Sequence, residues 1–230
     1  MKKTLIICFI ALMPGLTFSQ HVIGIMASGG IGGIATTNYT PPEYATVKDY
    51  AQVSCSGGLF YSFYLGEKSI LGVEIVYNYM QNKRAYTIEY FNTADKLIGV
   101  VTNTGYDYMS YVTLPILYSY KLKRWTPYIG FYGSYQFWHD GRLVQSGYYE
   151  NEIKDHTWHA WSSMKDYDIG AIAGVMFEIS DRFMGSLRLK YGLLDLKEYE
   201  SSSQKHLYQI TLGIKYNVLV KGVPKSTTDE

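Results

Sequence analysis

The chain has 230 residues, and its 21 basic and 20 acidic side chains almost cancel, so its charge does not indicate a nucleic acid or an anionic surface as a partner. Cys55 is the only cysteine after the first 20 residues, which excludes an internal disulfide once those residues are removed. The 210 residues that follow suit a single domain and contain no run of roughly 18 apolar residues, which excludes a membrane-spanning helix.

Residues 1–20 are typical of a secretory signal peptide that is cleaved from the mature chain. Two lysines form its basic start, residues 5–12 are apolar, and Thr17 and Ser19 place small side chains before a cut after Ser19. A lipid anchor on Cys8 is the competing interpretation, but Cys8 lies inside the apolar segment with almost no signal before it. Cleavage removes two lysines and no acid, so the mature chain has a formal charge of −1.

Eight segments alternate between apolar and polar residues, as strands with one apolar face do. The last segment is the clearest, because Ile210, Leu212 and Ile214 alternate with Thr211 and Gly213. About ten residues of such alternation is the length that a tilted strand needs to cross a bilayer. In chain order, the predicted strands are Val22–Ser28, Tyr50–Tyr64, Ser69–Gln81, Tyr106–Tyr120, Pro127–Trp138, Asp166–Ile179, Phe183–Leu194 and His206–Val218.

The predicted connections alternate between short and long. The short connections have hairpin length and fall at residues 66–68, 121–126 and 180–182. The long connections are predicted loops at residues 29–49, 82–105, 139–165 and 195–205. This asymmetry is typical of a bacterial outer-membrane barrel, with short turns in the periplasm and long loops outside. Pro115 lies in the middle of a predicted strand, and its missing N–H predicts a local bulge there.

We therefore predict an all-β fold, an eight-stranded antiparallel up-and-down transmembrane β-barrel over residues 21–218 in a bacterial outer membrane. An even strand number closes the sheet and leaves no free edge. A soluble barrel with an apolar interior shows the same alternation. The 24 tyrosines and the many Gly and Ser residues of the polar face favour lipid outside, because tyrosine suits membrane interfaces and a narrow lumen admits mainly small side chains.

The polar face also carries charged residues of both signs, which we expect to line the lumen: Glu74, Asp168, Glu178, Arg188, Lys190 and Lys215. An eight-stranded lumen is only just wide enough to be filled by side chains, and buried charges need partners. The pattern therefore favours a paired plug, and a water-filled path is the alternative.

Three stretches resemble a known family. Residues 111–120 (YVTLPILYSY) and 127–133 (PYIGFYG) resemble the core of the PorT-like outer-membrane β-barrel family, common in Bacteroidetes, and residues 189–195 (LKYGLLD) resemble a later strand of that family. The resemblance implies an eight-stranded barrel, usually described only as porin-like or outer-membrane. A few members belong to the type IX secretion machinery, and the family implies no catalytic residues.

The end of the last strand resembles the assembly signal of outer-membrane proteins, which normally closes the chain. The matching residues are Thr211, Gly213, Tyr216 and Val218. Residues 219–230 follow this signal, and we interpret them as a polar periplasmic tail.

Candidate chemistry is sparse. The glycines at residues 29–33 precede prolines rather than a helix, so a phosphate loop is not favoured. His156 and His159 have metal-pair spacing but lie in a polar loop, so we expect no metal and no cofactor. Serines and histidines of the same loop could serve a lipid-A-modifying enzyme, but nothing fixes them on neighbouring strands.

The loop at residues 139–165 also carries aromatic side chains of the kind that binding surfaces use: Tyr148, Tyr149, Trp158 and Trp161. They could equally rest on the outer leaflet. We therefore predict a non-enzymatic barrel with a structural or binding role, through its extracellular loops or as an envelope-assembly subunit, type IX secretion being one such assembly. A narrow porin-like channel is the alternative, and a lipid-A-modifying enzyme is a distant third. The expected partners are outer-membrane lipid and an envelope protein.

Overall fold

The protein is a single antiparallel sheet rolled into a ring. The computed structural model describes residues 20–37, 43–94, 96–150, 152–153, 155–159, 165–196 and 204–221. Its strands are β1 (His21–Thr37), β2 (Ala45–Tyr64), β3 (Ser69–Phe91), β4 (Leu97–Tyr120), β5 (Trp125–Tyr149), β6 (Glu152–Ile153), β7 (His156–His159), β8 (Tyr167–Glu178), β9 (Phe183–Gly192) and β10 (Gln204–Lys221). None of the described residues forms a helix that is long and apolar enough to cross a membrane.

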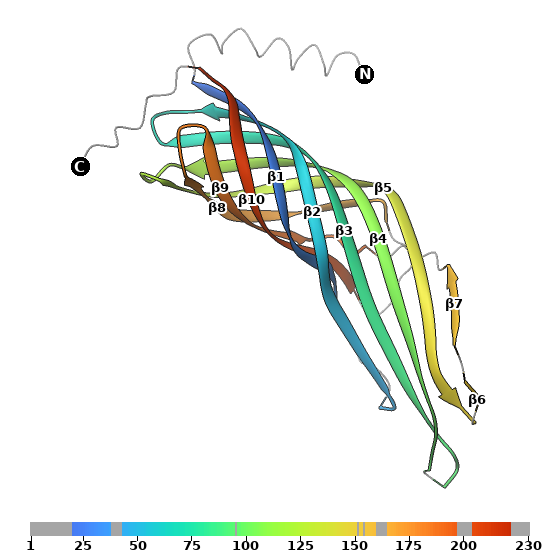
Figure 1. The fold of residues 1–230 in the computed structure, drawn as a ribbon. Helices are drawn as coiled ribbons and strands as arrows, with labels where there is room; N and C mark the ends of the chain where they lie inside the picture. Colours follow the sequence, from blue (N-terminus) through green and yellow to red (C-terminus); the bar gives the residue numbers. More distant parts are fainter. Residues whose placement is uncertain are drawn as a thin grey trace, which may run out of the picture.

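Eight strands close the ring, which confirms the predicted fold class. Each pairs with its chain neighbour, β5 pairs with β8, and β1 pairs with β10 to complete the circle. We call the end that carries the short turns, at residues 65–68, 121–124 and 179–182, the turn end. His21 and Lys221 face each other in the β1–β10 ladder at this end, so both ends of the described barrel lie there (Figure 1).

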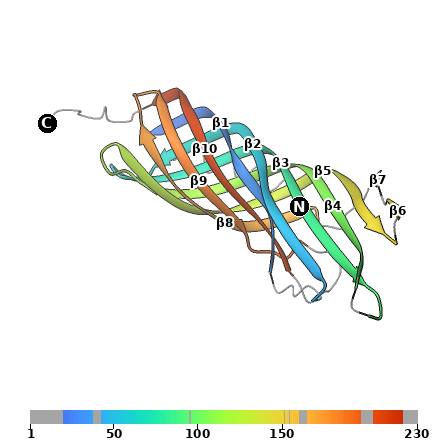
Figure 2. The ribbon, with the colours of Figure 1, turned by 60° about the horizontal axis from the view of Figure 1, so that its bottom comes forward.

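At the opposite end, four strands continue far beyond the ring. The β1–β2 ladder stops at Gly32 and Gln52, and the β5–β8 ladder stops at Tyr135 and Tyr167. Beyond these pairs, β2, β3, β4 and β5 form a curved sheet that projects to one side (Figures 1 and 2). We call this sheet the overhang; it consists of residues 45–51, 82–91, 97–109 and 138–149. The short strands β6 and β7 pair with its β5 edge.

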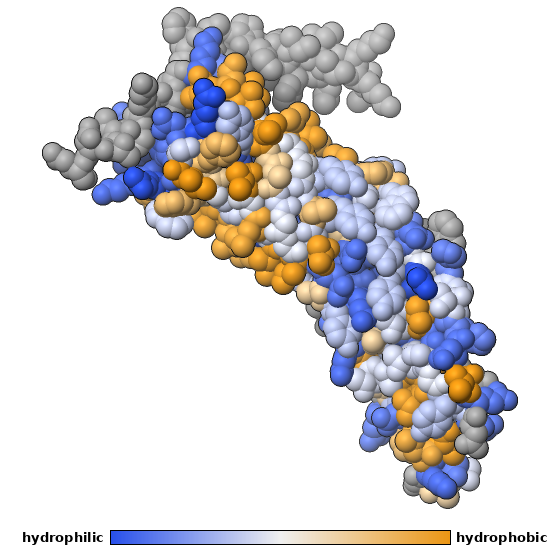
Figure 3. Space-filling model, in the orientation of Figure 1, coloured by the Kyte–Doolittle hydropathy of each residue, from blue (hydrophilic) through white to orange (hydrophobic). Residues whose placement is uncertain are grey.

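Alternation assigns each side chain of the ring to one of two faces. Leu212 is 68% exposed on the outer wall, whereas its neighbour Thr211 is only 4% exposed and points into the lumen. Large apolar side chains cover the outer wall of the ring, and hydrophilic ones become frequent along the overhang (Figure 3). The outside of the ring is therefore apolar and its inside is largely polar, as the lipid-outside interpretation requires.

Several predicted loops are strand in the structure, so the predicted bounds were too short. β1 runs nine residues past Ser28 through the glycine-rich segment. Gly30 explains this: a Cβ there would lie only 2.0 Å from the Ile210 carbonyl oxygen, so the glycine permits a close approach to β10. Most of the predicted loop at residues 82–105 is strand as well. Its actual turn is held by Asn92, whose side-chain oxygen accepts hydrogen bonds from the backbone N–H groups of Ala94 and Lys96.

Pro115 does not produce the predicted bulge. The β3–β4 pairs Val73–Ile116 and Val76–Thr113 have the same offset, so no residue is inserted between them. The ladder omits two pairs at this point, while Pro115 still faces Tyr132 on β5. The missing N–H is therefore accommodated by a local gap in one ladder. A bulge does occur in the β1–β10 ladder, between Ile23 and Gly24. In addition, β10 continues three residues beyond its predicted end, to Lys221.

Candidate functional site

An acidic side chain lies between two basic ones at the centre of the lumen. Glu74 projects inward from β3, Arg188 from β9 and Lys215 from β10, and all three are buried. Lys215 Nζ lies 2.6 Å from Glu74 Oε1, and Arg188 Nη2 lies 3.0 Å from Oε1 and 2.8 Å from Oε2. Since β3 is not a neighbour of β9 or β10 in the ring, these contacts join opposite walls. We call the three residues the central triad.

Aromatic side chains surround the central triad. Arg188 Nε donates to the Tyr128 hydroxyl at 3.2 Å, and its guanidinium lies over the same ring at 5.7 Å from the centroid. Lys215 Nζ lies 4.8 Å from the centroid of the Phe60 ring. These rings exclude water from the charges, so the attraction between unlike charges is stronger than it would be in solvent.

The other predicted lumen charges do not join the central triad. Asp168 accepts a 2.5 Å hydrogen bond from the Tyr132 hydroxyl. Lys190 Nζ donates to Thr113 and Ser134, each at 3.3 Å, and lies 4.2 and 4.5 Å from the ring centroids of Tyr132 and Tyr111. Lys190 makes no ion pair within 4 Å among the described residues. The predicted six-residue set is therefore split into separate groups, not one network.

Apolar layers fill the lumen between these polar groups. One layer lies toward the overhang and two lie toward the turn end; their members are Ile34, Met80, Met109, Tyr111, Leu196 and Leu207, then Leu117, Tyr128, Tyr132, Ile172 and Met176, and finally Val22, Met26, Phe60 and Val76. The lumen tyrosines are not among the predicted site residues, because tyrosine in a membrane protein is expected mainly at the interface. Alternation along β4 and β5 places Tyr111, Tyr128 and Tyr132 on the inner face and could have found them.

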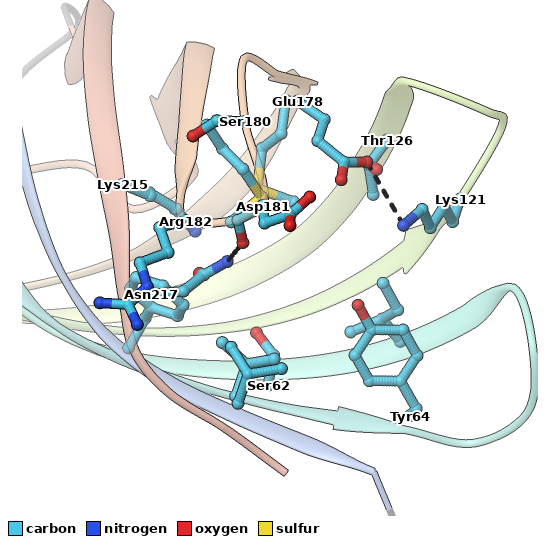
Figure 4. A pocket seen from close by; sticks show the side chains of 16 residues that line it. Ser62, Tyr64, Lys121, Thr126, Glu178, Ser180, Asp181, Arg182, Lys215 and Asn217 are labelled. Carbon is cyan, nitrogen blue, oxygen red and sulfur yellow. Dashed lines mark hydrogen bonds and ion pairs between the residues drawn. The ribbon is translucent and has the colours of Figure 1, made fainter. Parts of the chain in front are cut away.

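Glu178 lies at the mouth of the barrel at the turn end. Lys121 Nζ lies 3.3 Å from its Oε2. This pair lines a vestibule of about 360 Å³. Lys215 of the central triad lines the same vestibule (Figure 4). Asn217 also lines it and donates to the Asp181 carbonyl oxygen at 3.2 Å (Figure 4). The vestibule is therefore an open basin of mixed polarity.

Beyond the vestibule the lumen narrows sharply. A second cavity, between Asn78, Thr113, Arg188 and Lys190, measures only about 10 Å³. That volume is about what one water molecule requires. The central triad and its rings therefore stand between the vestibule and the rest of the lumen.

A polar cluster crosses the lumen where the overhang begins. Asn82 Nδ2 donates to Asp107 Oδ2 at 3.2 Å, and its Oδ1 accepts from the backbone N–H of Ile34 at 3.1 Å. His139 Nε2 lies 3.2 Å from the other Asp107 oxygen. Burial alone would raise the pKa of Asp107, but the hydrogen bonds from His139 and Asn82 outweigh it and lower the pKa below its usual value.

The structure does not bring together the three predicted loop aromatics that it describes. Tyr148 and Tyr149 end β5, where the Tyr149 ring packs edge-on against Tyr90 at 4.9 Å between centroids. Trp158 lies on β7 opposite Leu143, about 17 Å along the strand from Tyr148. Trp161 lies outside the described residues. Tyr148, Tyr149 and Trp158 therefore belong to strands of the overhang and its edge, not to one loop.

The residues of the predicted assembly signal lie along β10. Thr211 points into the lumen, and Gly213 lies against Ser28 of β1. The Tyr216 ring packs against Phe183 at 4.9 Å between centroids, and its hydroxyl accepts from Arg182 at 3.1 Å. Val218 is exposed and is the residue that the β1–β10 register passes over.

With this geometry established, sequence comparison identifies the family. Residues 18–198 match the outer membrane protein beta-barrel domain, and the chain belongs to that family. The protein is thus an outer-membrane β-barrel and resides in the outer membrane of a bacterium. No curated protein sequence matches the chain significantly.

Solved structures of other outer-membrane proteins are similar to this one at low identity. Neisserial surface protein A is 9% identical, with a TM-score of 0.43; the matched region covers 85% of the present chain and 96% of the Neisserial chain. Ail of Yersinia pestis, in complex with a heparin analogue, is 12% identical with a TM-score of 0.36, covering 86% and 97%. The outer membrane protease OmpT of Escherichia coli is 8% identical with a TM-score of 0.38, covering 86% and 94%. These scores are too low to carry an argument about function.

Proposed function

We propose that the protein is a closed outer-membrane barrel that serves as a rigid base for a binding surface on the overhang. The main support for this proposal is that β2–β5 continue as a hydrogen-bonded sheet beyond the ring, and that side chains fill the lumen of the ring. Binding residues are most useful on a rigid scaffold, because less conformational entropy is lost when they engage a partner. The partner that this role implies is another protein of the cell envelope.

We propose further that the overhang faces outward and the turn end faces the periplasm. Short periplasmic turns and long extracellular segments are the usual arrangement of outer-membrane barrels. Membership of the PorT-like branch, with its link to type IX secretion, remains a proposal that rests on residues 111–120, 127–133 and 189–195. In that case the partner would be another subunit of the secretion machinery.

Two other functions compete with this proposal. A narrow porin-like channel would need a continuous path, and the second cavity of about 10 Å³ argues against one. A lipid-A-modifying enzyme would need a serine, a histidine and an acid at hydrogen-bonding distance. Among the described residues, His139 faces Asp107 and His159 faces Asp140 at 3.7 Å, and neither pair includes a serine. A role without catalysis therefore fits better.

Site-specific photocrosslinking in intact cells tests the proposed function. A photoreactive amino acid at Tyr148 or at Trp158, both of which are exposed, is expected to capture a specific protein. The control replaces Ile129, which is 66% exposed against 44% for Tyr148 but lies on the apolar wall, and it should capture lipid only. If neither Tyr148 nor Trp158 yields a protein adduct while Ile129 behaves as expected, the binding function is wrong.

A further inference from the structure

Four neighbouring strands place tyrosines and cations alternately in one row on the outer face of the overhang. Tyr50 of β2 is opposite Lys83 of β3, Lys83 is opposite Tyr106 of β4, and Tyr106 is opposite Arg142 of β5. We call these four residues the tyrosine–cation row. Directly opposed residues of a sheet lie on the same face, so the four side chains share one surface.

That surface is continuous with the outer wall of the ring. Lys83 lies six residues after Tyr77 on β3, an even number, so the two side chains are on the same face of the sheet. Tyr77 is 47% exposed. On β2, a bulge separates Tyr50 from Val53, which lies closer to the ring and is 64% exposed. The row therefore begins where the apolar wall ends. In a bilayer that position is the headgroup region, where tyrosine is favoured.

Among the described residues, neither cation of the row has an acidic partner within 4 Å. Lys83 Nζ lies 5.2 Å from the Tyr50 ring centroid and 5.5 Å from the Tyr106 ring centroid. Neither Lys83 nor Arg142 makes an ion pair within 4 Å in the part of the chain that the structure describes. The nearest acid on this face, Asp140, instead contacts His159 at 3.7 Å. The charge of Lys83 therefore lies between two aromatic rings, and Arg142 adds a second charge at the end of the row, opposite Tyr106.

The spacing of the cations defines the ligand. Lys83 and Arg142 are two strands apart, which is about 10 Å. An arginine side chain matches the oxygens of a phosphate with two parallel hydrogen bonds, and a lysine binds phosphate as a point charge. Tyr106, between them, offers a flat ring and a hydroxyl. A ligand that fits has two phosphates separated by a sugar-sized polar body.

We propose that the tyrosine–cation row binds the headgroup of a glycolipid that carries two phosphates, one on Lys83 and one on Arg142. The lipid chains lie along the adjacent apolar wall, and the sugar between the phosphates covers Tyr106. A glycolipid accounts for the row better than a simple phospholipid, whose single phosphate would engage only one of the two cations.

Native mass spectrometry of the full-length barrel tests this proposal. The barrel is folded in zwitterionic vesicles that contain a bisphosphorylated glycolipid, or the same lipid with both phosphates removed, and is then extracted in mild detergent. The unmodified barrel should retain the phosphorylated lipid. Lys83→Gln with Arg142→Gln should lower the retained fraction about tenfold or more, because it removes the charge-assisted contacts to both phosphates. Arg142→Lys should fall between the two.

The matched control is Lys68→Gln with Arg124→Gln, which removes the same charges from the turn end and should leave retention unchanged. Heat-dependent gel mobility verifies that each variant is folded. Equal retention of the dephosphorylated lipid, equal retention of phosphatidic acid, or competition by inorganic phosphate alone would each overturn the proposed ligand. Retention that survives the double substitution in the row would overturn the site.

Discussion

Glu74 is the residue on which the lumen depends most. It is 1% exposed and is the acid that two buried cations share, from strands that do not touch β3 in the sheet. A carboxylate in this position neutralises one of two positive charges and orders both side chains. Without it, Arg188 and Lys215 would face each other with no counter-charge in a confined space.

Glu74→Ala should therefore destabilise the barrel by about 3–5 kcal/mol, the usual consequence of leaving a buried charge uncompensated. The free energy of unfolding in lipid vesicles, measured with urea, gives this difference. Glu67→Ala is the control, because Glu67 is exposed in the β2–β3 turn, and it should change stability by less than about 0.5 kcal/mol. Equal stability of the two variants would show that the central triad contributes nothing.

At the scale of the element, the first strand of the ring, β1, closes the barrel against the last strand, β10, through a close approach at Gly30. A Cβ at Gly30 would lie 2.0 Å from a backbone oxygen of β10, whereas one at Gly29 would find its nearest atom at 4.0 Å. Gly30→Ala should therefore cost about 1–3 kcal/mol through overpacking. Gly29→Ala should be nearly neutral. Unfolding of both variants in vesicles checks this, and a loss of stability in Gly29→Ala alone would contradict it.

The strand β10 tests the assignment of its two faces. Leu212→Arg should cost roughly 2–4 kcal/mol if that side chain meets the middle of the bilayer. Thr211→Ser, on the lumen face, keeps the hydroxyl and loses one methyl group, so it should be tolerated. Equilibrium folding into vesicles measures both differences. A stable Leu212→Arg beside an unstable Thr211→Ser would mean that the faces are reversed.

The sequence predicts well whether a side chain faces the lumen or the outer wall, but it predicts poorly which inward side chains touch each other. Alternation has a period of two, so the sides of Leu212, Glu74 and Arg188 follow directly from their positions. Which inward residues meet depends on how far each strand is shifted along its neighbour. Glu74 and Arg188 are 114 residues apart, and no local pattern encodes their common height. Only the closed sheet, with its accumulated register, brings them together.

The overhang was missed for a different reason. Residues 86–91 read YTIEYF, a β-branched and aromatic run that predicts a strand. The alternation of short and long connections instead predicts a loop over residues 82–105. The strand signal is therefore present in these residues, and it conflicts with the predicted loop. The glycines of β1 also favour a loop where the structure has a strand, because glycine usually indicates a loop. Here it permits close packing between strands.

At the scale of the whole molecule, the long strands give the barrel two unlike ends. If the overhang faces outward, an epitope tag inserted after Glu150 should be labelled by antibody on intact cells, because residue 150 follows β5 at the tip of the overhang. A tag at Asp181, in a turn at the opposite end, should be labelled only after the outer membrane is made permeable. Equal labelling of both sites, or labelling of Asp181 alone, would refute this orientation.

The filled lumen makes a prediction about conduction. The vestibule of about 360 Å³ is followed by a cavity of about 10 Å³, and the central triad lies between them. Unlike charges a few ångströms apart attract strongly where water is scarce, so the triad should hold the path shut. The purified barrel in a planar bilayer should therefore show no steady current. Glu74→Ala should add brief openings, because repulsion between Arg188 and Lys215 separates the side chains that block the path. Glu67→Ala should stay closed. A steady, ion-selective current from the unmodified protein would refute the plug and make the porin-like channel the better function.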